Sequence, residues 1–270
     1  MSGNRRYVPI LRWKQAERLA LRDLRPDVRS QITPLVQLVP ESIAVGKRIP
    51  TVKKALGKVA ADMRGCWGTS PIMIDLRHID PSMRIDGNTH SLAYLARHAR
   101  ANSVSMIPVT GLHRDAAYQA AVRDTVAEDG RGACLRLFRR DLENLKLRAD
   151  VRHLLEQIGL EPSRVDLVVD LQFHDGSCPD FASLSPLVPD IDKWRCLVVA
   201  SGAFPRDLTQ FKTPGRYSIA RQDWLGWLGE IQFGEKLARM PIFSDYAVYH
   251  PTYMPPSFAN FSASIRYTDD

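Results

Sequence analysis

Residues 165–171 read Val-Asp-Leu-Val-Val-Asp-Leu, a mainly apolar run that ends beside the carboxylate of Asp170. A strand with one exposed face alternates apolar and polar residues, whereas a nearly continuous apolar run is typical of a strand buried on both faces. Strands of this kind occur mainly in parallel sheets that helices cover. The run therefore predicts an α/β fold with a parallel sheet.

Similar runs recur along the chain and alternate with stretches of helical spacing, such as residues 16–24 and 142–158. Strands that alternate with helices predict parallel βαβ units. Eight such runs predict a (β/α)8 TIM-barrel-like fold, and residues 1–270 are expected to form one domain. An open doubly wound sheet is the alternative, but no glycine-rich phosphate loop follows the first run. The eight runs are residues 7–11, 32–39, 71–76, 105–110, 133–137, 165–171, 196–200 and 242–248.

The C-terminal part of the chain is less regular than the rest. Met254 is followed by two prolines, which break a helix, and no closing eighth helix is evident. Residues 265–268 predict an extra strand instead. Two explanations stay open: another element covers that side of the barrel, or the natural protein continues past Asp270.

Bulk properties limit the classes of protein to consider. No apolar run approaches the roughly 18 residues of a membrane-spanning helix, and the N-terminus lacks the apolar region of a signal peptide. A cytoplasmic protein without a membrane partner is therefore expected. The four cysteines show no metal-ligand spacing. A net charge of +7 favours an anionic partner, although the basic residues are spread out and an ordinary solvated excess explains them as well.

The reactive groups of such a barrel stand at the C-terminal ends of its strands. Asp75 and Asp170 each follow an apolar strand directly, where a buried carboxylate must be paired, hydrogen-bonded or metal-bound. Together with Glu17 and Asp245 they are the candidate catalytic residues. Glu17, Asp75 and Asp170 are also the candidate ligands of Mg²⁺, which prefers oxygen ligands. The alternative is a structural charge network in which these carboxylates pair with Lys14, Arg136 and Arg221.

A second group of residues is expected to bind substrate. Arg136 lies inside a strand, and its planar guanidinium suits either a phosphate or a structural carboxylate. The amides around Ser201 are candidate anion donors, although the following Gly202 favours an ordinary tight turn. His250 is a candidate general base, as is His78, although a lone loop histidine is more often structural. The candidate substrate-binding residues are Lys14, Arg136, Gln172, Ser201, Arg221, Tyr246 and His250.

Residues 7–17 read Tyr-Val-Pro-Ile-Leu-Arg-Trp-Lys-Gln-Ala-Glu, which resembles the opening of the phage-type beta protein family. Similar segments recur at residues 32–35, 107–109, 135–137, 201–205, 244–246, 250–251 and 263–268, with Ser244 at a position where glycine is expected. The resemblance implies a phage or mobile-element setting and no settled activity. It also implies that a longer C-terminus is usual. The recurrent residues that it suggests are Lys14, Glu17, Arg136, Asp170, Ser201, Arg221, Asp245 and Tyr246.

Three functional hypotheses follow. The first is a metal-assisted hydrolase acting on a phosphate ester, nucleotide or nucleic acid, in which Arg136 and Lys14 bind the anion. The second is a non-catalytic protein of phage–host conflict, in anti-phage defence or counter-defence, that recognises a phage or host protein or a nucleic acid. In the third, the polar strand ends are a vestigial charge network on a scaffold, because a fold alone does not determine function.

Overall fold

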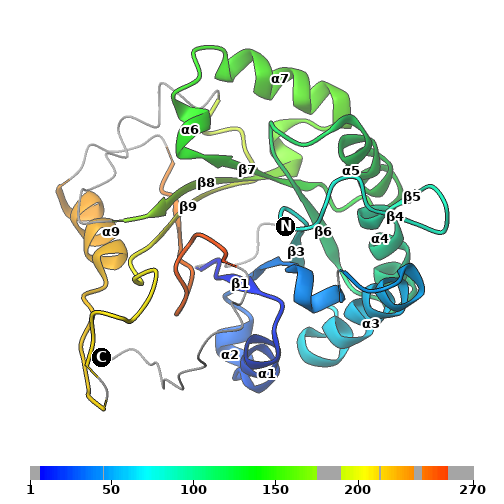
Figure 1. Cartoon of the computed structure of the whole chain (residues 1–270). Coiled ribbons are helices and arrows are strands. Elements are labelled where there is room, and N and C mark those ends of the chain that lie inside the picture. The colour runs from blue at the N-terminus through cyan, green and yellow to red at the C-terminus, as the bar shows by residue number, and fades with distance from the viewer. Residues whose placement is uncertain (1–6, 45, 175–189, 213, 234–238, 255–270) are drawn as a thin grey trace.

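The computed structural model describes residues 7–44, 46–174, 190–212, 214–233 and 239–254. Eight strands form one sheet in the order β1-β2-β3-β6-β7-β8-β9-β10, and every neighbouring pair is parallel. Helices surround the strands (Figure 1). The strands are β1 (Ile10–Arg12), β2 (Leu35–Gln37), β3 (Ile72–Asp75), β6 (Met106–Thr110), β7 (Ala133–Phe138), β8 (Val165–Phe173), β9 (Cys196–Gly202) and β10 (Ile242–Ser244).

Hydrogen bonds between the first and last strands bring the two edges of the sheet together. The amide of Val8 donates to the carbonyl of Phe243 at 3.1 Å, and the amide of Ile10 donates to the carbonyl of Asp245 at 2.8 Å. The predicted parallel TIM-barrel-like fold is therefore confirmed. Residues 265–268 and any eighth helix lie outside the described residues, and the single-domain organisation of the whole chain stays a prediction.

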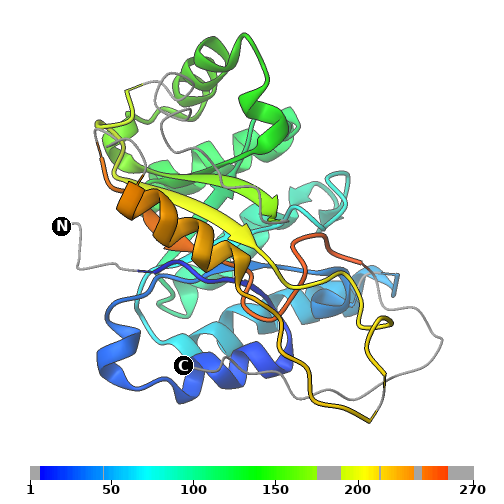
Figure 2. The same ribbon diagram turned by 90° about the vertical axis from the view of Figure 1, so that its left-hand side faces the viewer.

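The helices follow the strands in the expected alternation except between β8 and β9, where residues 175–189 lie outside the described part of the chain. Helix α9 lies along the outside of β9 (Figure 2). A short hairpin of β4 (Arg84–Ile85) and β5 (Thr89–His90) was not expected. Within the described residues, no helix combines the length and apolar character needed to cross a bilayer. The helices are α1 (Gln15–Asp23), α2 (Pro26–Arg29), η1 (Pro40–Ile43), α3 (Ile49–Trp67), α4 (Ser91–Ala101), α5 (Ala116–Asp129), α6 (Arg139–Leu142), α7 (Leu147–Ile158), η2 (Pro162–Arg164) and α9 (Gln222–Phe233).

Local sequence signals set the helix ends. The side chain of Asp115 accepts a hydrogen bond from the amide of Tyr118 at the start of α5, and Gly130 ends that helix at φ 65°. The helix predicted over residues 142–158 is interrupted and is replaced by α6 and α7. Asn144 explains the interruption, because its Oδ1 accepts a hydrogen bond from the amide of Lys146 at 2.9 Å and closes a turn.

Two apolar clusters divide the core into the inside and the outside of the barrel. Val198 and Ala200 belong to the inner cluster, whereas Leu197 and Val199 belong to the larger outer cluster beneath the helices. Successive side chains of a strand point to opposite faces of the sheet. Arg136 follows Cys134 of the inner cluster by two residues, and Asp170 follows Val168 in the same way. Both polar side chains therefore continue the inner stack towards the C-terminal mouth.

Candidate functional site

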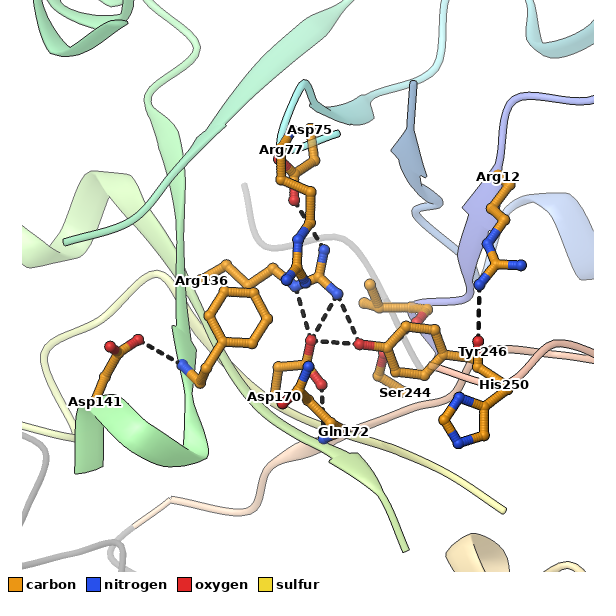
Figure 3. Close-up of polar contacts among 12 residues, drawn as sticks. Arg12, Asp75, Arg77, Arg136, Asp141, Asp170, Gln172, Ser244, Tyr246 and His250 are labelled. Atoms are coloured by element: carbon orange, nitrogen blue, oxygen red, sulfur yellow. Dashed lines mark hydrogen bonds and ion pairs between the residues drawn. The ribbon is translucent and has the colours of Figure 1, made fainter. Parts of the chain in front are cut away.

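The guanidinium of Arg136 lies between two carboxylates from neighbouring parts of the barrel (Figure 3). Its Nη1 donates to Asp75 Oδ2 at 2.8 Å, while Nε and Nη2 donate to Asp170 Oδ2 at 2.9 and 2.6 Å. All three side chains are at most 1% exposed. Burial alone would lower the pKa of Arg136, but Tyr246, Asp170 and Asp75 together raise it. Arg136 is therefore a permanent buried cation.

Two further side chains complete the hydrogen bonding of this cation. The hydroxyl of Tyr246 donates to Asp170 Oδ2 at 2.5 Å and accepts from Arg136 Nη2 at 2.8 Å. Burial, together with the nearby Asp170, raises the pKa of Tyr246, so the phenol stays neutral. With its carboxamide oxygen turned towards Arg136, Gln37 accepts from Nη1 at 2.7 Å and from Nη2 at 3.2 Å.

Asp75 links this network to the loop that follows β6. Its Oδ1 accepts hydrogen bonds from the Arg114 guanidinium and, at 2.8 Å, from the backbone amide of Arg77. Burial opposes the charged form of Asp75, but Arg114, Arg136 and Arg77 outweigh it and lower its pKa to about 2. Asp75 therefore stays ionised at neutral pH.

Arg77 stands beside this network without a carboxylate of its own (Figure 3). Its guanidinium lies 4.2 Å from the centre of the Phe138 ring, and its side chain makes no hydrogen bond or ion pair with any described residue. Burial and the neighbouring Arg136 lower its pKa. The adjacent His78 is held neutral, since burial and Arg77 lower its pKa to about 3. Among the described residues, Arg77 is thus the cation of this group whose guanidinium has no hydrogen-bonded anion.

Arg12, at the end of β1, carries a second part of the mouth. Its Nη2 donates to the carbonyls of His250 at 2.8 Å and Thr252 at 3.1 Å. The guanidinium packs against the rings of Tyr249 and Tyr253. Burial lowers the pKa of Arg12, an effect that nearby groups including Glu17 oppose. Arg12 therefore anchors the segment after β10 to the first strand.

Asp245 belongs to a separate charge cluster at the seam of the barrel. Its Oδ2 accepts from Arg221 Nη2 at 2.6 Å, and its Oδ1 accepts from the hydroxyl of Tyr7. Arg221 also pairs with both oxygens of Asp223, at 2.9 and 2.8 Å. This cluster ties the start of α9 to the seam, and within the described residues none of its side chains hydrogen-bonds to Arg136.

The remaining predicted residues scatter around the mouth. Lys14 faces Glu41 at 3.9 Å, while Glu17 is only 7% exposed and both its carboxylate oxygens lack a hydrogen-bond partner among the described residues. Ser201 is buried and, by alternation with the inward Ala200, points away from the barrel interior.

Gln172 and His250 occupy positions nearer to the centre of the mouth. Gln172 adopts φ 61° at a bulge in β8, and its backbone N–H donates to Asp170 Oδ1 at 2.9 Å. The ring of His250 stacks on Phe173, with centroids 4.9 Å apart. Its Nδ1 accepts from the amide of Thr252, so that nitrogen is not available as a base.

The observed arrangement does not fit the expected Mg²⁺ site. Asp75 and Asp170 both turn oxygens towards Arg136, which occupies the space between them. Within the described part of the chain, no three His, Cys, Asp or Glu side chains gather closely enough to hold a metal ion. The geometry instead matches the structural charge network that was the alternative for Asp75, Asp170 and Arg136.

The sequence profile of the beta protein family matches residues 7–270, nearly the whole chain. The chain belongs to the beta protein family. The resemblance seen in the short segments is thereby confirmed. No curated protein matches the chain.

Two members of the Arg136 network in this beta-family chain, Gln37 and Arg114, were not expected from the sequence, and neither was Arg12 at the mouth. Gln37 and Arg12 end the strands β2 and β1, so the rule that selected Asp75 applied to them as well. Arg114 lies in the loop between β6 and α5, where no periodicity fixes the direction of a side chain. Only its contact with Asp75 identifies it.

Proposed function

We propose that this beta-family chain binds a phosphate-bearing ligand at the C-terminal mouth of the barrel, with Arg77 as the first contact. A charge imbalance carries the proposal. Within the described part of the chain, three guanidinium groups, those of Arg77, Arg114 and Arg136, share two carboxylates, Asp75 and Asp170. Like charges in a partly buried site repel one another, so an anion beside Arg77 would be stabilised.

The surroundings of Arg77 favour phosphate over a simple point charge. Its guanidinium lies over the face of Phe138, an arrangement in which the N–H groups at its edge remain available. A planar fork of N–H groups matches two oxygens of a phosphate. The neutral His78 beside it supplies a buried Nε2 that no described residue contacts by a hydrogen bond. A phosphate ester has oxygens for both groups.

The hydrogen bonds that Asp170 accepts fit a role in ligand binding better than a role as the general base of a hydrolase. Its Oδ2 already accepts from Arg136 and Tyr246, and its Oδ1 accepts from the amide of Gln172. A general base needs a free lone pair within reach of the nucleophile. We therefore assign to Asp170 the positioning of Arg136. A measurement of phosphate release from a phosphate ester tests for hydrolysis.

Calorimetric titration tests this proposal with adenosine monophosphate and inorganic phosphate as probes. Arg77→Met should weaken binding at least about tenfold, the loss expected for one charge-assisted contact of roughly 1.5 kcal/mol or more. Arg123→Met is the matched control, because Arg123 pairs with Asp124 on the exposed surface of α5. Equal affinity of the wild type and the folded Arg77→Met variant would contradict the proposal.

A role in phage–host conflict is the second candidate, and it rests on membership of the beta protein family. In that setting the same arginines would contact a nucleic acid or a protein. Titration with a short single-stranded DNA separates these ligands, since affinity for nucleic acid should fall steeply with salt. An affinity for DNA that does not change with salt concentration would argue against recognition of a nucleic acid.

A further inference from the structure

A hollow of about 460 Å³ lies between α1, η1 and α3. Its size falls within the range of roughly 300–1,000 Å³ that is usual for small-molecule sites. The helices α1 and α3 pack against each other on one side of the barrel (Figure 2). The polar and aromatic side chains around the hollow include Trp13, Lys14, Arg18, Glu41, Lys58 and Asp62.

The charges around the hollow do not balance. Asp62 pairs with both Arg18, at 2.5 Å, and Lys58, at 3.0 Å. Among the described carboxylates, Lys14 reaches Glu41 alone, at the long distance of 3.9 Å, and the Glu41 Oε2 accepts a hydrogen bond from Tyr253 at 2.5 Å. Among the residues that line the hollow, three cations therefore share two carboxylates, and Lys14 has the weakest pairing. An anion is the ligand that this excess favours.

The second, independent observation is the indole of Trp13. This side chain is 3% exposed, it lines the hollow, and its Nε1 has no hydrogen-bond acceptor among the described residues. A buried N–H without a partner is uncommon and costly. The ring of Trp13 also forms an apolar wall with Ala55 and Val59 of α3. The residues that line the hollow thus include one with an unused donor, an underpaired cation and apolar side chains.

We infer that this hollow binds a small organic oxyanion with an apolar body. The anionic oxygens accept from Lys14 Nζ and Trp13 Nε1, and the apolar body lies against Ala55 and Val59. A neutral molecule of the same shape leaves the charge of Lys14 unmatched and binds more weakly. None of the lining residues belongs to the Arg136 network, so this site is distinct from the proposed phosphate site at the mouth.

Nuclear magnetic resonance tests the inference through the indole N–H signal of Trp13. The chain has five tryptophans, and the Trp13→Phe variant identifies which signal is that of Trp13. Phenyl phosphate is the anionic probe and benzyl alcohol is its neutral counterpart. Phenyl phosphate at millimolar concentration should shift the Trp13 signal in a saturable way, and benzyl alcohol should leave it unchanged.

Three variants separate this site from others. Lys14→Met should weaken the binding of phenyl phosphate at least about tenfold, as loss of a charge-assisted contact predicts. Lys54→Met removes an exposed charge of α3 that does not line the hollow, and it should leave the affinity unchanged. Arg77→Met should leave unchanged the affinity that the Trp13 signal reports, even if the proposed function at the mouth fails, and any phenyl phosphate bound at the mouth does not enter this reading.

Three results would overturn the inference. The first is no saturable shift of the Trp13 indole signal with phenyl phosphate, and the second is an equal shift with benzyl alcohol. The third is an affinity for phenyl phosphate that folded Lys14→Met does not reduce. A shift of Trp13 that disappears in Arg77→Met also overturns it, because the anion would then bind at the mouth and act on the indole from a distance.

Discussion

Arg136 donates two hydrogen bonds to a single oxygen of Asp170, from Nε at 2.9 Å and from Nη2 at 2.6 Å. The other edge of the same guanidinium donates to Asp75. Because both carboxylates are fully buried, neither has water as a substitute partner. Arg136 therefore holds three strands, β3, β7 and β8, in one charged layer at the mouth of the barrel.

Removal of Arg136 should strongly destabilise the protein. Arg136→Met leaves two buried carboxylates without their cation, and breaking a buried pair in this way costs roughly 3–5 kcal/mol. Urea unfolding at neutral pH measures the loss. Arg123→Met removes a surface pair with Asp124 and should cost at most about 1 kcal/mol. Similar losses for the two variants would mean that the network does not stabilise the fold.

Tyr246→Phe should destabilise the chain by roughly 1–3 kcal/mol, because it leaves buried partners of the hydroxyl incompletely hydrogen-bonded. The lost hydroxyl donates to Asp170 and accepts from Arg136. Tyr217→Phe is the control, since it removes a hydroxyl from a side chain that is 48% exposed. Thermal or urea unfolding compares the two, and an equal effect would show that burial of the Tyr246 hydroxyl is unimportant.

Asp75 should make the fold sensitive to acid. Burial raises its pKa, but Arg114, Arg136 and Arg77 outweigh this and lower the pKa from 3.8 to about 2. A depressed folded-state pKa stabilises the fold above pH about 4, and the contribution of roughly 2 kcal/mol is lost as the pH falls to about 2. Urea unfolding of Asp75→Asn should therefore show its deficit at neutral pH and a smaller one near pH 2. Asp27→Asn, a change on the exposed surface, should show no such trend.

His78 should stay neutral throughout the physiological range. Burial, followed by Arg77, lowers its pKa from 6.5 to about 3. The unfolded chain binds this proton first, so stability should decline as the pH falls below about 6.5, and His78→Phe should remove that part of the decline. Nuclear magnetic resonance measures the titration of the imidazole ring. A His78 signal that is constant between pH about 5 and 8 would agree with a neutral ring, whereas a signal that titrates near pH 6.5 would contradict this prediction.

The positions of the strands could be predicted because their signal is local. Runs such as residues 165–171 are apolar on both faces, and only a covered parallel sheet buries both faces of a strand. The same argument selected Asp75 and Asp170 as strand ends, and both lie in the Arg136 network. The family resemblance rested on short segments, and it was sufficient to identify the family.

The grouping of the polar residues could not be predicted in the same way. Asp245 stands at the C-terminal end of an apolar run, as Asp75 does, yet it pairs with Arg221 at the seam. Lys14 and Glu17 follow β1, yet Lys14 faces Glu41. Arg114, which completes the partners of Asp75, has no local signal at all.

The sequence by itself therefore determined the parallel barrel, the family and the strand ends at which charged residues would gather. Only the tertiary structure decided which charges meet. The reason is geometric, since alternation along a strand, the register between strands and the path of each loop together set the direction of every side chain. Ser201 points away from the barrel interior, while Ala200, one residue earlier, packs inside it.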